Sequence, residues 1–203
     1  MGVSTSFTGR KLPLFTGRFP TRPLKQFIGT IHTSTFSSGC SNVIVTVGPP
    51  NTFTDDHIDR FKSLVLAGGE VAEHGLRDLI LAANWLAFGW EDDQLLGIAG
   101  LKNPKLSYRD RISKSSGVAL KVDELPLEFG WVFIEHIGRG RGLSLPLGQS
   151  LIEATNRQGV FATSRSDNLR MHKTLNKLGF TRMGTEWPSK QNDGMVCLFV
   201  RTT

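Results

Sequence analysis

Length, composition and charge describe an ordinary globular chain. Its 203 residues carry a formal net charge of +6, with 39% hydrophobic and 21% charged residues, which suits one domain plus an extension. No apolar run reaches the roughly 18 residues that a membrane-spanning helix needs. The two cysteines, Cys40 and Cys197, are too few for a disulfide framework and too widely spaced for a zinc site. We therefore expect a cytoplasmic protein with neither a membrane span nor a metal ion.

The positive charge is concentrated at the start of the chain. Residues 1–40 contain five Lys or Arg and no Asp or Glu, whereas the remainder is almost neutral. We predict a basic N-terminal extension over 1–40 and a folded domain over 41–203. The extension fits a flexible tail, an organellar transit peptide interrupted by prolines, or a myristoylated N-terminus, since Met1 to Ser6 match the loose myristoylation pattern. A transit peptide would place the protein in an organelle, and the nearly neutral domain does not favour a nucleic-acid partner.

The first part of the domain predicts a strand, two helices and a hairpin. The β-branched run 43–47 is typical of a strand. Thr54 precedes an acidic first turn, and apolar residues then recur at helical spacing until a Gly-Gly pair ends the helix. A second short helix is expected over 70–81. Two apolar runs, 84–90 and 95–101, flank a four-residue polar turn and predict a β-hairpin.

The second part begins with a polar, irregular stretch over 103–125, which we interpret as a long loop forming one wall of a substrate cleft. The elements after it are, in order, a strand, a Gly-rich loop, a helix, a strand, a helix and a strand, over residues 127–134, 138–144, 143–156, 160–163, 166–177 and 195–201. This order of elements predicts an α/β (α+β) fold with a mixed sheet flanked by helices.

The Gly-rich loop, GRGRGLS at 138–144, lies between a predicted strand and a predicted helix. At such a junction, free backbone N–H groups and the positive end of the helix dipole face an anion. The loop has neither the Lys-Ser or Lys-Thr of a P-loop nor the G-x-G-x-x-G of a dinucleotide fold. We predict a diphosphate-binding loop of another kind, with contacts from Arg139, Gly140, Arg141, Gly142, Leu143 and Ser144.

The spacing of this loop resembles the signature of the GCN5-related N-acetyltransferases: Gln or Arg, two residues, Gly, one residue, then Gly or Ala. Arg139, Gly142 and Ser144 occupy those places. A second signature of the family, an Asn that opens a helix ending in Gly-Phe, is similar to the stretch from Asn168 to Phe180. The resemblance implies a mostly antiparallel sheet, acetyl-CoA as cofactor with CoA as product, and transfer of an acyl group to an amine.

The same resemblance implies roles for further residues. In the family, the Asn side chain touches the pantetheine or phosphate part of the cofactor, a role that falls here on Asn168. The strand before the loop pairs its backbone with the pantetheine amides, a role that falls on Val132, Phe133 and Ile134. The acceptor would be a small-molecule amine or a protein amine, and a homodimer is one possible assembly.

Glu128 is our candidate for the general base that removes a proton from the attacking amine. It lies on the predicted strand before the loop, where alternation puts it on the same face as Gly130. Burial of the Glu128 carboxylate in a cleft would suit it to the role of a base. The alternative is a structural Glu that only pairs with a neighbouring cation. Glu135 and His136, nearer the loop, are the other candidates.

The proton donor for the CoA thiolate is less obvious. Leu175 occupies the place where many relatives have a donating Tyr, and Tyr108 is the single tyrosine of the chain. Solvent, the hydroxyl of Ser164, or Tyr108 if its stretch folds inward, could serve instead. His172 is another candidate, and its alternative role is to pack at the edge of the apolar stripe of its helix. The missing Tyr and the early helical Pro146 also leave open a catalytically degenerate acyl-CoA sensor, and the basic extension leaves open a nucleic-acid-binding protein.

Overall fold

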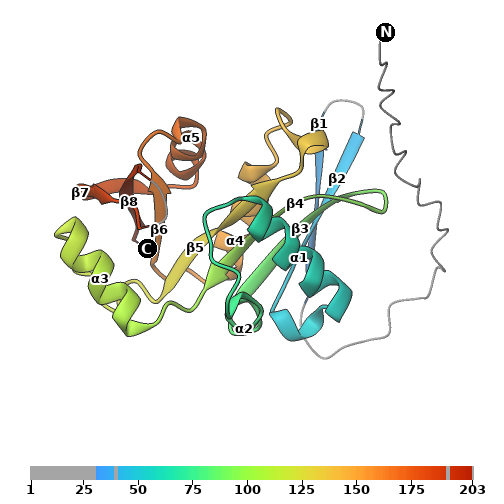
Figure 1. Ribbon diagram of the computed structural model, residues 1–203. Coiled ribbons are helices and arrows are strands. Elements are labelled where there is room, and N and C mark those ends of the chain that lie inside the picture. Colours follow the sequence, from blue (N-terminus) through green and yellow to red (C-terminus); the bar gives the residue numbers. More distant parts are fainter. Residues whose placement is uncertain (1–30, 39–40, 191–192, 203) are drawn as a thin grey trace, which may run out of the picture.

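The computed structural model describes residues 31–38, 41–190 and 193–202. Within them the chain forms a single sheet of eight strands in the order β1-β2-β3-β4-β5-β6-β8-β7, with helices on both faces (Figure 1). In this part of the chain β5 and β6 are the only parallel neighbours. The predicted mixed, mostly antiparallel sheet flanked by helices is therefore confirmed.

The strands are β1 (His32–Ser38), β2 (Ser41–Gly48), β3 (Trp85–Glu91), β4 (Gln94–Lys102), β5 (Leu127–Ile134), β6 (Val160–Arg165), β7 (Thr181–Pro188) and β8 (Met195–Arg201). The helices are α1 (Asp55–Ala67), α2 (Leu76–Leu81), α3 (Leu106–Ser116), α4 (Ser144–Ala154) and α5 (Leu169–Lys177), with short 3-10 turns η1 (Pro50–Thr52) and η2 (His136–Gly138).

The sheet begins earlier than the predicted domain boundary at residue 41. Residues 32–38, which the sequence analysis assigned to the N-terminal extension, form β1 and pair antiparallel with β2 along their whole length. The strand is rich in Ser and Thr and lies at the edge of the sheet, and Phe36 packs against the main core. Residues 1–30 of the predicted extension lie outside the described residues.

Helices α1 and α2 cover one face of the sheet. Thr54 caps α1 by accepting a hydrogen bond from the backbone of His57, as its position before two aspartates predicts. The apolar face of α1, with Ile58 and Phe61, packs on Phe88 and its neighbours in β3 and β4. The first helix and the β3–β4 hairpin therefore form as expected, whereas the second helix is shorter than the 70–81 segment in which it was expected.

Helix α4 covers the opposite face and carries the main core. Leu147 and Leu151 are fully buried against the small and β-branched residues of β2, β3 and β4. At the same core, Leu175 and Leu178 of the α5 region pack beside α4. The helix that follows the Gly-rich loop is thus fixed by a continuous apolar face.

The stretch 103–125 is not the irregular loop that we predicted, because it contains α3. This helix has no side-chain cap at its start and ends at Gly117, which has a φ of +75°. Its buried face consists of Arg109, Ile112 and Ser116 at helical spacing. Two of these three residues are polar, and the usual apolar signature of a helix is therefore weak.

The sheet is narrowly connected at its centre. Strand β5 pairs with β6 only over Leu127–Phe129, and an irregularity in the pairing with β4 coincides with Trp131, whose φ is +53°. Figure 1 shows the result as two groups of elements, β1–β5 with α1, α2 and α4, and β6–β8 with α3 and α5. An ion pair between Glu70 and Arg165, at 3.6 Å, also joins the groups.

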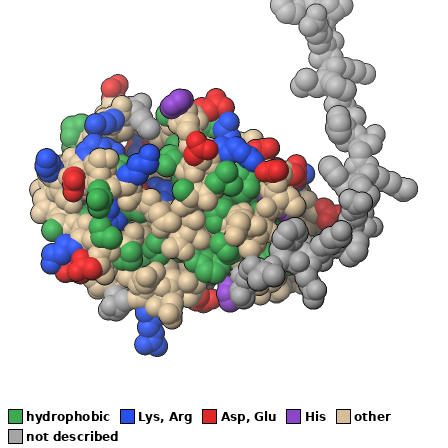
Figure 2. Space-filling view, turned by 90° about the horizontal axis from the view of Figure 1, so that it is seen from below, with side chains coloured by type: hydrophobic (Ala, Val, Ile, Leu, Met, Phe, Trp, Pro, Cys, Tyr) green, Lys and Arg blue, Asp and Glu red, His purple; other side chains and the backbone are tan. Residues whose placement is uncertain are grey.

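Charged side chains of both signs are interspersed on the face shown in Figure 2, around hydrophobic and uncharged side chains. The described atoms of this face therefore form no broad basic patch. No helix in the described ranges is long and apolar enough to cross a membrane.

Candidate functional site

The loop between β5 and α4 has the open backbone that an anion site needs. Gly140 and Gly142 have φ values of +80° and +74°, a region that residues with a Cβ atom rarely adopt. Apart from each glycine and its two chain neighbours, no described atom lies within 4 Å of the position that a Cβ would take. The two glycines therefore leave space beside the loop.

The donors of the loop are also available. Helix α4 begins at Ser144 without a side-chain cap. Among the described residues, the backbone N–H groups of Gly140, Gly142, Leu143 and Ser144 donate to no protein acceptor. Pro146 is the third residue of α4, where an N–H would have no partner within the helix. The loop thus fits a diphosphate, and Pro146 removes only one possible donor.

The two arginines of the loop have different environments. Both guanidinium nitrogens Nη1 and Nη2 of Arg141 bind the carboxylate of Glu91, at 2.9 and 2.6 Å. Glu91 ends β3, and this ion pair therefore fastens the loop to the β3–β4 hairpin. Arg139 is exposed, donates from Nε to the carbonyl of Ile134 and lies over the ring of Phe133. Of the two, Arg139 is better placed to meet a phosphate without breaking an ion pair.

Helix α5 meets the start of α4. The hydroxyls of Ser144 and Thr174 lie 3.2 Å apart and join the two helices. Asn168 caps α5 by accepting a hydrogen bond from the backbone of Met171, and its side chain is exposed. Asn168 rather than Ser166 or Asp167 therefore begins this helix, and its amide nitrogen remains available to a ligand.

Strand β5 connects the loop with the predicted base. Ile134 and Phe133 pair with β4 on one side, whereas on the other side β6 stops pairing at Phe129. Val132, Phe133 and Ile134, which we predicted to contact pantetheine, lie in this segment of β5. An extended ligand along its open edge would run from the loop toward Glu128.

Glu128 lies near the other end of β5, in a buried polar cluster. Its side chain is only 3% exposed, and its carboxylate forms an ion pair with Lys102 of β4 at 2.8 Å. The hydroxyl of Tyr108, on α3, donates to it at 2.9 Å, and that of Thr163, on β6, does so at 3.4 Å. A buried carboxylate is stable here because charged and neutral donors from three elements surround it.

The same three contacts share one oxygen of the carboxylate. Lys102, Tyr108 and Thr163 all reach Oε1, and no described residue makes a hydrogen bond to Oε2. One oxygen therefore fixes the carboxylate, and the other keeps its lone pairs for a further partner.

Of the three predicted catalytic residues, the structure brings Glu128 and Tyr108 together but not Ser164. The burial of Tyr108 and the adjacent Glu128 carboxylate raise the pKa of its phenol well above the ordinary value. The alternation of β6 places Ser164 on the opposite face from Thr163, where its hydroxyl contacts the backbone of Arg165.

The other sequence candidates lie elsewhere. Leu175 is fully buried in the main core, and the place of the usual Tyr is therefore packed with aliphatic atoms. His172 contacts the carbonyl of Arg165 and the ring of Phe199. Glu135 caps η2 through the backbone of His136, at the end of β5 remote from Glu128.

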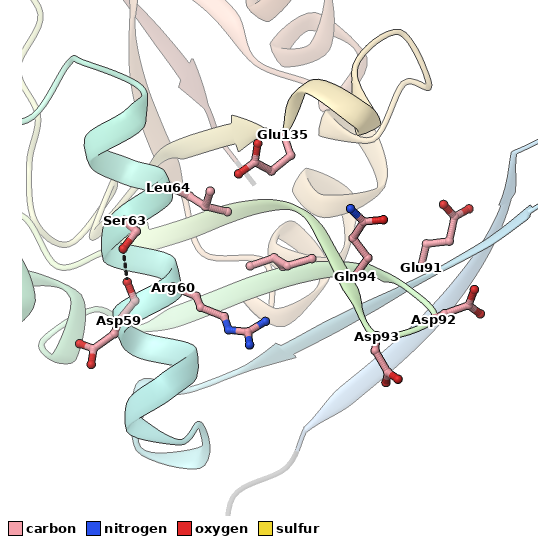
Figure 3. A pocket seen from close by; sticks show the side chains of 10 residues that line it. Asp59, Arg60, Ser63, Leu64, Glu91, Asp92, Asp93, Gln94 and Glu135 are labelled. Carbon is pink, nitrogen blue, oxygen red and sulfur yellow. Dashed lines mark hydrogen bonds between the residues drawn. The ribbon is translucent and has the colours of Figure 1, made fainter. Parts of the chain in front are cut away.

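Glu135 also borders an open pocket of about 800 Å³ between α1 and the β3–β4 hairpin. Figure 3 shows Asp59 and Arg60 on α1, and Asp92 and Asp93 at the hairpin tip. The carboxylates that line this pocket outnumber its single lining cation, Arg60. The excess of negative charge favours positively charged molecules. Separately, the described residues include no group of three or more His, Cys, Asp or Glu that could hold a metal ion.

Sequence reasoning missed Lys102 and Thr163. Lys102 is the last residue of β4, and its partner across the sheet is Glu128. The two residues are separated by α3 and its flanking segments, and no local pattern predicts this register. A Lys at the end of a hairpin strand usually lies in solvent, and Lys102 therefore gave no sign of a buried contact.

The comparisons with known proteins agree with this architecture. No protein-family model matches the sequence, and no curated protein matches it. Many solved structures match the fold. An acetyltransferase of the GNAT family from Streptococcus agalactiae is 22% identical, with a TM-score of 0.56, and the match covers 78% of this chain and 95% of that one.

Two further structures contain ligands. YncA from Salmonella typhimurium, solved with its cofactor acetyl-CoA, is 15% identical with a TM-score of 0.56, covering 80% of this chain and 94% of that one. A chain of the NatC complex, bound to a Gag peptide and CoA, is 14% identical with a TM-score of 0.57, covering 78% and 98%. The chain therefore has the GCN5-related N-acetyltransferase fold, and the predicted resemblance is confirmed at that level.

Proposed function

We propose that this protein is an acyl-CoA-dependent N-acyltransferase that moves an acetyl or similar acyl group to a primary amine. The observation that carries this proposal is the continuity of β5. At one end of the strand lies a loop with free N–H donors, in the middle an unpaired edge, and near the other end the buried carboxylate of Glu128. Together these features provide a cofactor path that leads to a base.

The residues that would hold CoA are those that the structure leaves open. The N–H groups of Gly142 and Ser144, with Arg139, suit the diphosphate, and the backbone of β5 from Val132 to Ile134 suits the amides of pantetheine. Asn168, at the start of α5, can contact the pantetheine part of the same CoA molecule. When bound, acetyl-CoA supplies the acyl group as an activated thioester. The structures of YncA and NatC support this proposal through their shared fold.

In this proposal Glu128 takes a proton from the ammonium form of the acceptor, directly or through water, and the neutral amine attacks the thioester carbon. The C–N bond forms, the C–S bond breaks, the nitrogen of the new bond releases a second proton to solvent, and the thiolate takes a proton. Tyr108 is a poor source of that proton because its raised pKa lies far above the value near 8.5 of an ordinary thiol. We assign the return of the proton to protonated Glu128 or to solvent, and assign Tyr108 a hydrogen bond to the base.

The test combines thiol release with variants of the candidate base. Purified protein is mixed with acetyl-CoA and a panel of amines that includes polyamines, amino acids and peptides with free N-termini or lysines. We expect turnover with at least one amine and a loss of kcat of about 10² to 10⁴-fold in E128Q. E153Q, on the exposed side of α4, should match the wild type. A larger loss in E135Q than in E128Q would assign the base to Glu135.

The second candidate function is an acyl-CoA-binding sensor, which the buried Leu175 at the usual Tyr position favours. Calorimetry with CoA and acetyl-CoA separates the two. Micromolar binding without turnover of any amine would support the sensor and contradict the enzyme. An absence of binding to either compound would contradict both.

A further inference from the structure

We propose that Lys102 is the positioning residue of Glu128: its ammonium fixes Oε1 of the carboxylate, so that Oε2 is presented to the acceptor amine. This proposal rests on the function proposed above, because it concerns the same base. The effect of Lys102 on Glu128, however, can be tested without any turnover.

The first support is the pairing itself. Lys102 and Glu128 are direct partners across the antiparallel strands β4 and β5, and their charged atoms are 2.8 Å apart. The Glu128 side chain is 3% exposed and that of Lys102 is 21% exposed, so the pair is shielded from solvent on the side of the acid. A carboxylate buried this deeply remains ionised only with a close cation or several donors.

The second support is the space that the sequence provides for the Lys102 side chain. A Cβ atom on Gly130 would lie 3.0 Å from both Cε and Nζ of Lys102. Glycine at this position therefore allows the side chain to cross β5 toward Glu128. On its other flank the ammonium lies 5.5 Å from the ring centre of Trp131, a distance typical of a cation–π contact.

The third support is that the other charged groups near Glu128 already have different partners. Arg109 of α3 interacts electrostatically with Glu128, but its guanidinium binds the carbonyls of Lys121, Leu125 and Pro126. Arg111 of α3 lies over the ring of Tyr108. Among the residues that the structure describes, the other hydrogen bonds to this carboxylate come from the hydroxyls of Tyr108 and Thr163. Lys102 is therefore the one described cation in direct contact with the carboxylate.

The single tyrosine provides a direct reporter. Protein labelled with ¹³C at tyrosine Cζ gives one resonance, from Tyr108, whose hydroxyl bonds to Glu128. Protonation of Glu128 changes that hydrogen bond and moves the resonance. We would follow it from pH 4 to pH 9 in the wild type and in K102M, K102R and K114M, with E128Q as the variant in which the change must disappear.

We expect the midpoint of the resonance change to rise by about 1 to 3 pH units in K102M, because a buried carboxylate without its cation binds a proton more tightly. K102R should restore most of the wild-type behaviour. K114M, which removes an exposed Lys of α3, should leave the curve unchanged. Coincident curves for K102M and the wild type would overturn the proposal.

G130A is a second test if K102M folds poorly. It keeps both charges but displaces the end of the Lys102 side chain, and it should shift the midpoint in the same direction by a smaller amount. The double variant G130A/K102M should resemble K102M alone, because the ammonium that the added methyl group would displace is then missing. A shift of equal size from G130A in the presence and absence of Lys102 would contradict the mechanism.

Once an acceptor amine is known, the pH dependence of kcat/KM extends the test. The acid limb should move upward in K102M by the same interval as the resonance, with about a tenfold loss per pH unit on that limb. If the wild type acylates no amine, the proposed function fails, while the resonance experiment still decides whether Lys102 controls Glu128. If the resonance moves but the acid limb does not, Lys102 does not position a base.

Discussion

The surroundings of His57 lower the pKa of its imidazole and thereby make the stability of the protein depend on pH. It lies in the first turn of α1 between the rings of Phe53, Phe88 and Trp90, with its Nδ1 3.0 Å from the hydroxyl of Thr54. Desolvation by these neighbours lowers the pKa of the imidazole below 6.5, against a smaller opposing effect of Asp56. The folded protein therefore disfavours the imidazolium.

Because the pKa is lower in the folded state, the unfolded chain binds the proton more readily. Stability contributed by neutral His57 is present above about pH 6.5 and is lost as the pH falls toward the folded-state pKa. We expect the free energy of unfolding, measured in urea, to fall less between pH 7 and pH 5 in H57Q than in the wild type. H74Q, at an exposed histidine, should follow the wild type. Parallel curves for all three proteins would contradict this prediction.

Leu175 permits a test of whether the missing family Tyr can simply be restored. Its side chain is fully buried against the main core. The ring and hydroxyl of L175Y should therefore overpack the site and cost about 1 to 3 kcal/mol of unfolding free energy, without increasing kcat. L169Y, on an exposed part of α5, is the matched control for stability. A faster L175Y enzyme would show that the core accommodates a donor.

At the level of elements, the backbone of the loop before α4 leads us to predict how a substitution there changes the affinity for CoA. Gly142 has a φ of +74°, and an alanine there should cost about 1 to 2 kcal/mol of backbone strain and bring a methyl group toward the diphosphate. We expect G142A to weaken CoA binding, measured by calorimetry, by tenfold or more.

Gly117 provides the control, since its φ is +75° and its Cβ position is equally open, but it lies at the end of α3. G117A should therefore lose similar stability and keep its CoA affinity. Equal losses of affinity in both variants would show that general destabilisation, rather than the loop, explains the effect.

The elements that sequence reasoning found are those whose chemistry is local. The strand in β2, the cap and face of α1, the hairpin and the β5–loop–α4 unit each follow from apolar period, turn residues or caps. The edge strands β1 and β7 were missed because their side chains are mostly polar or exposed and give no alternating apolar pattern. Helix α3 was missed because its buried face includes Arg109 and Ser116.

The site divides in the same way. Glu128 and the Gly-rich loop could be proposed from the sequence because they lie on one continuous strand and turn, and the loop has a motif of fixed spacing. The contacts of Glu128 with Lys102, Tyr108 and Thr163 depend on the pairing of β4, α3 and β6 around β5. Such contacts join residues distant in sequence, and their register is set by the assembled fold.

For the whole molecule, Arg109 joins α3 to the segment that precedes β5. It is 2% exposed, and its guanidinium donates to the carbonyls of Lys121, Leu125 and Pro126, which precede β5. In R109M those carbonyls lose their donors inside the protein. We expect a loss of about 2 to 3 kcal/mol in unfolding free energy, measured by urea denaturation, with K114M as the control on the same helix. An unchanged midpoint for R109M would mean that water replaces the guanidinium at no cost.

The narrow junction between β5 and β6 makes the contacts outside the ladder important for holding β1–β5 and β6–β8 together. Three residue pairs of the ladder join the two parts there, and the contact of Ser144 with Thr174 and the ion pair of Glu70 with Arg165 join them elsewhere. A ligand bound along the free edge of β5 that also touched Asn168 of α5 would add one more connection between the two parts. Binding would then stabilise the folded protein, and substitutions far from the loop that loosen either part of the sheet would weaken cofactor binding as well.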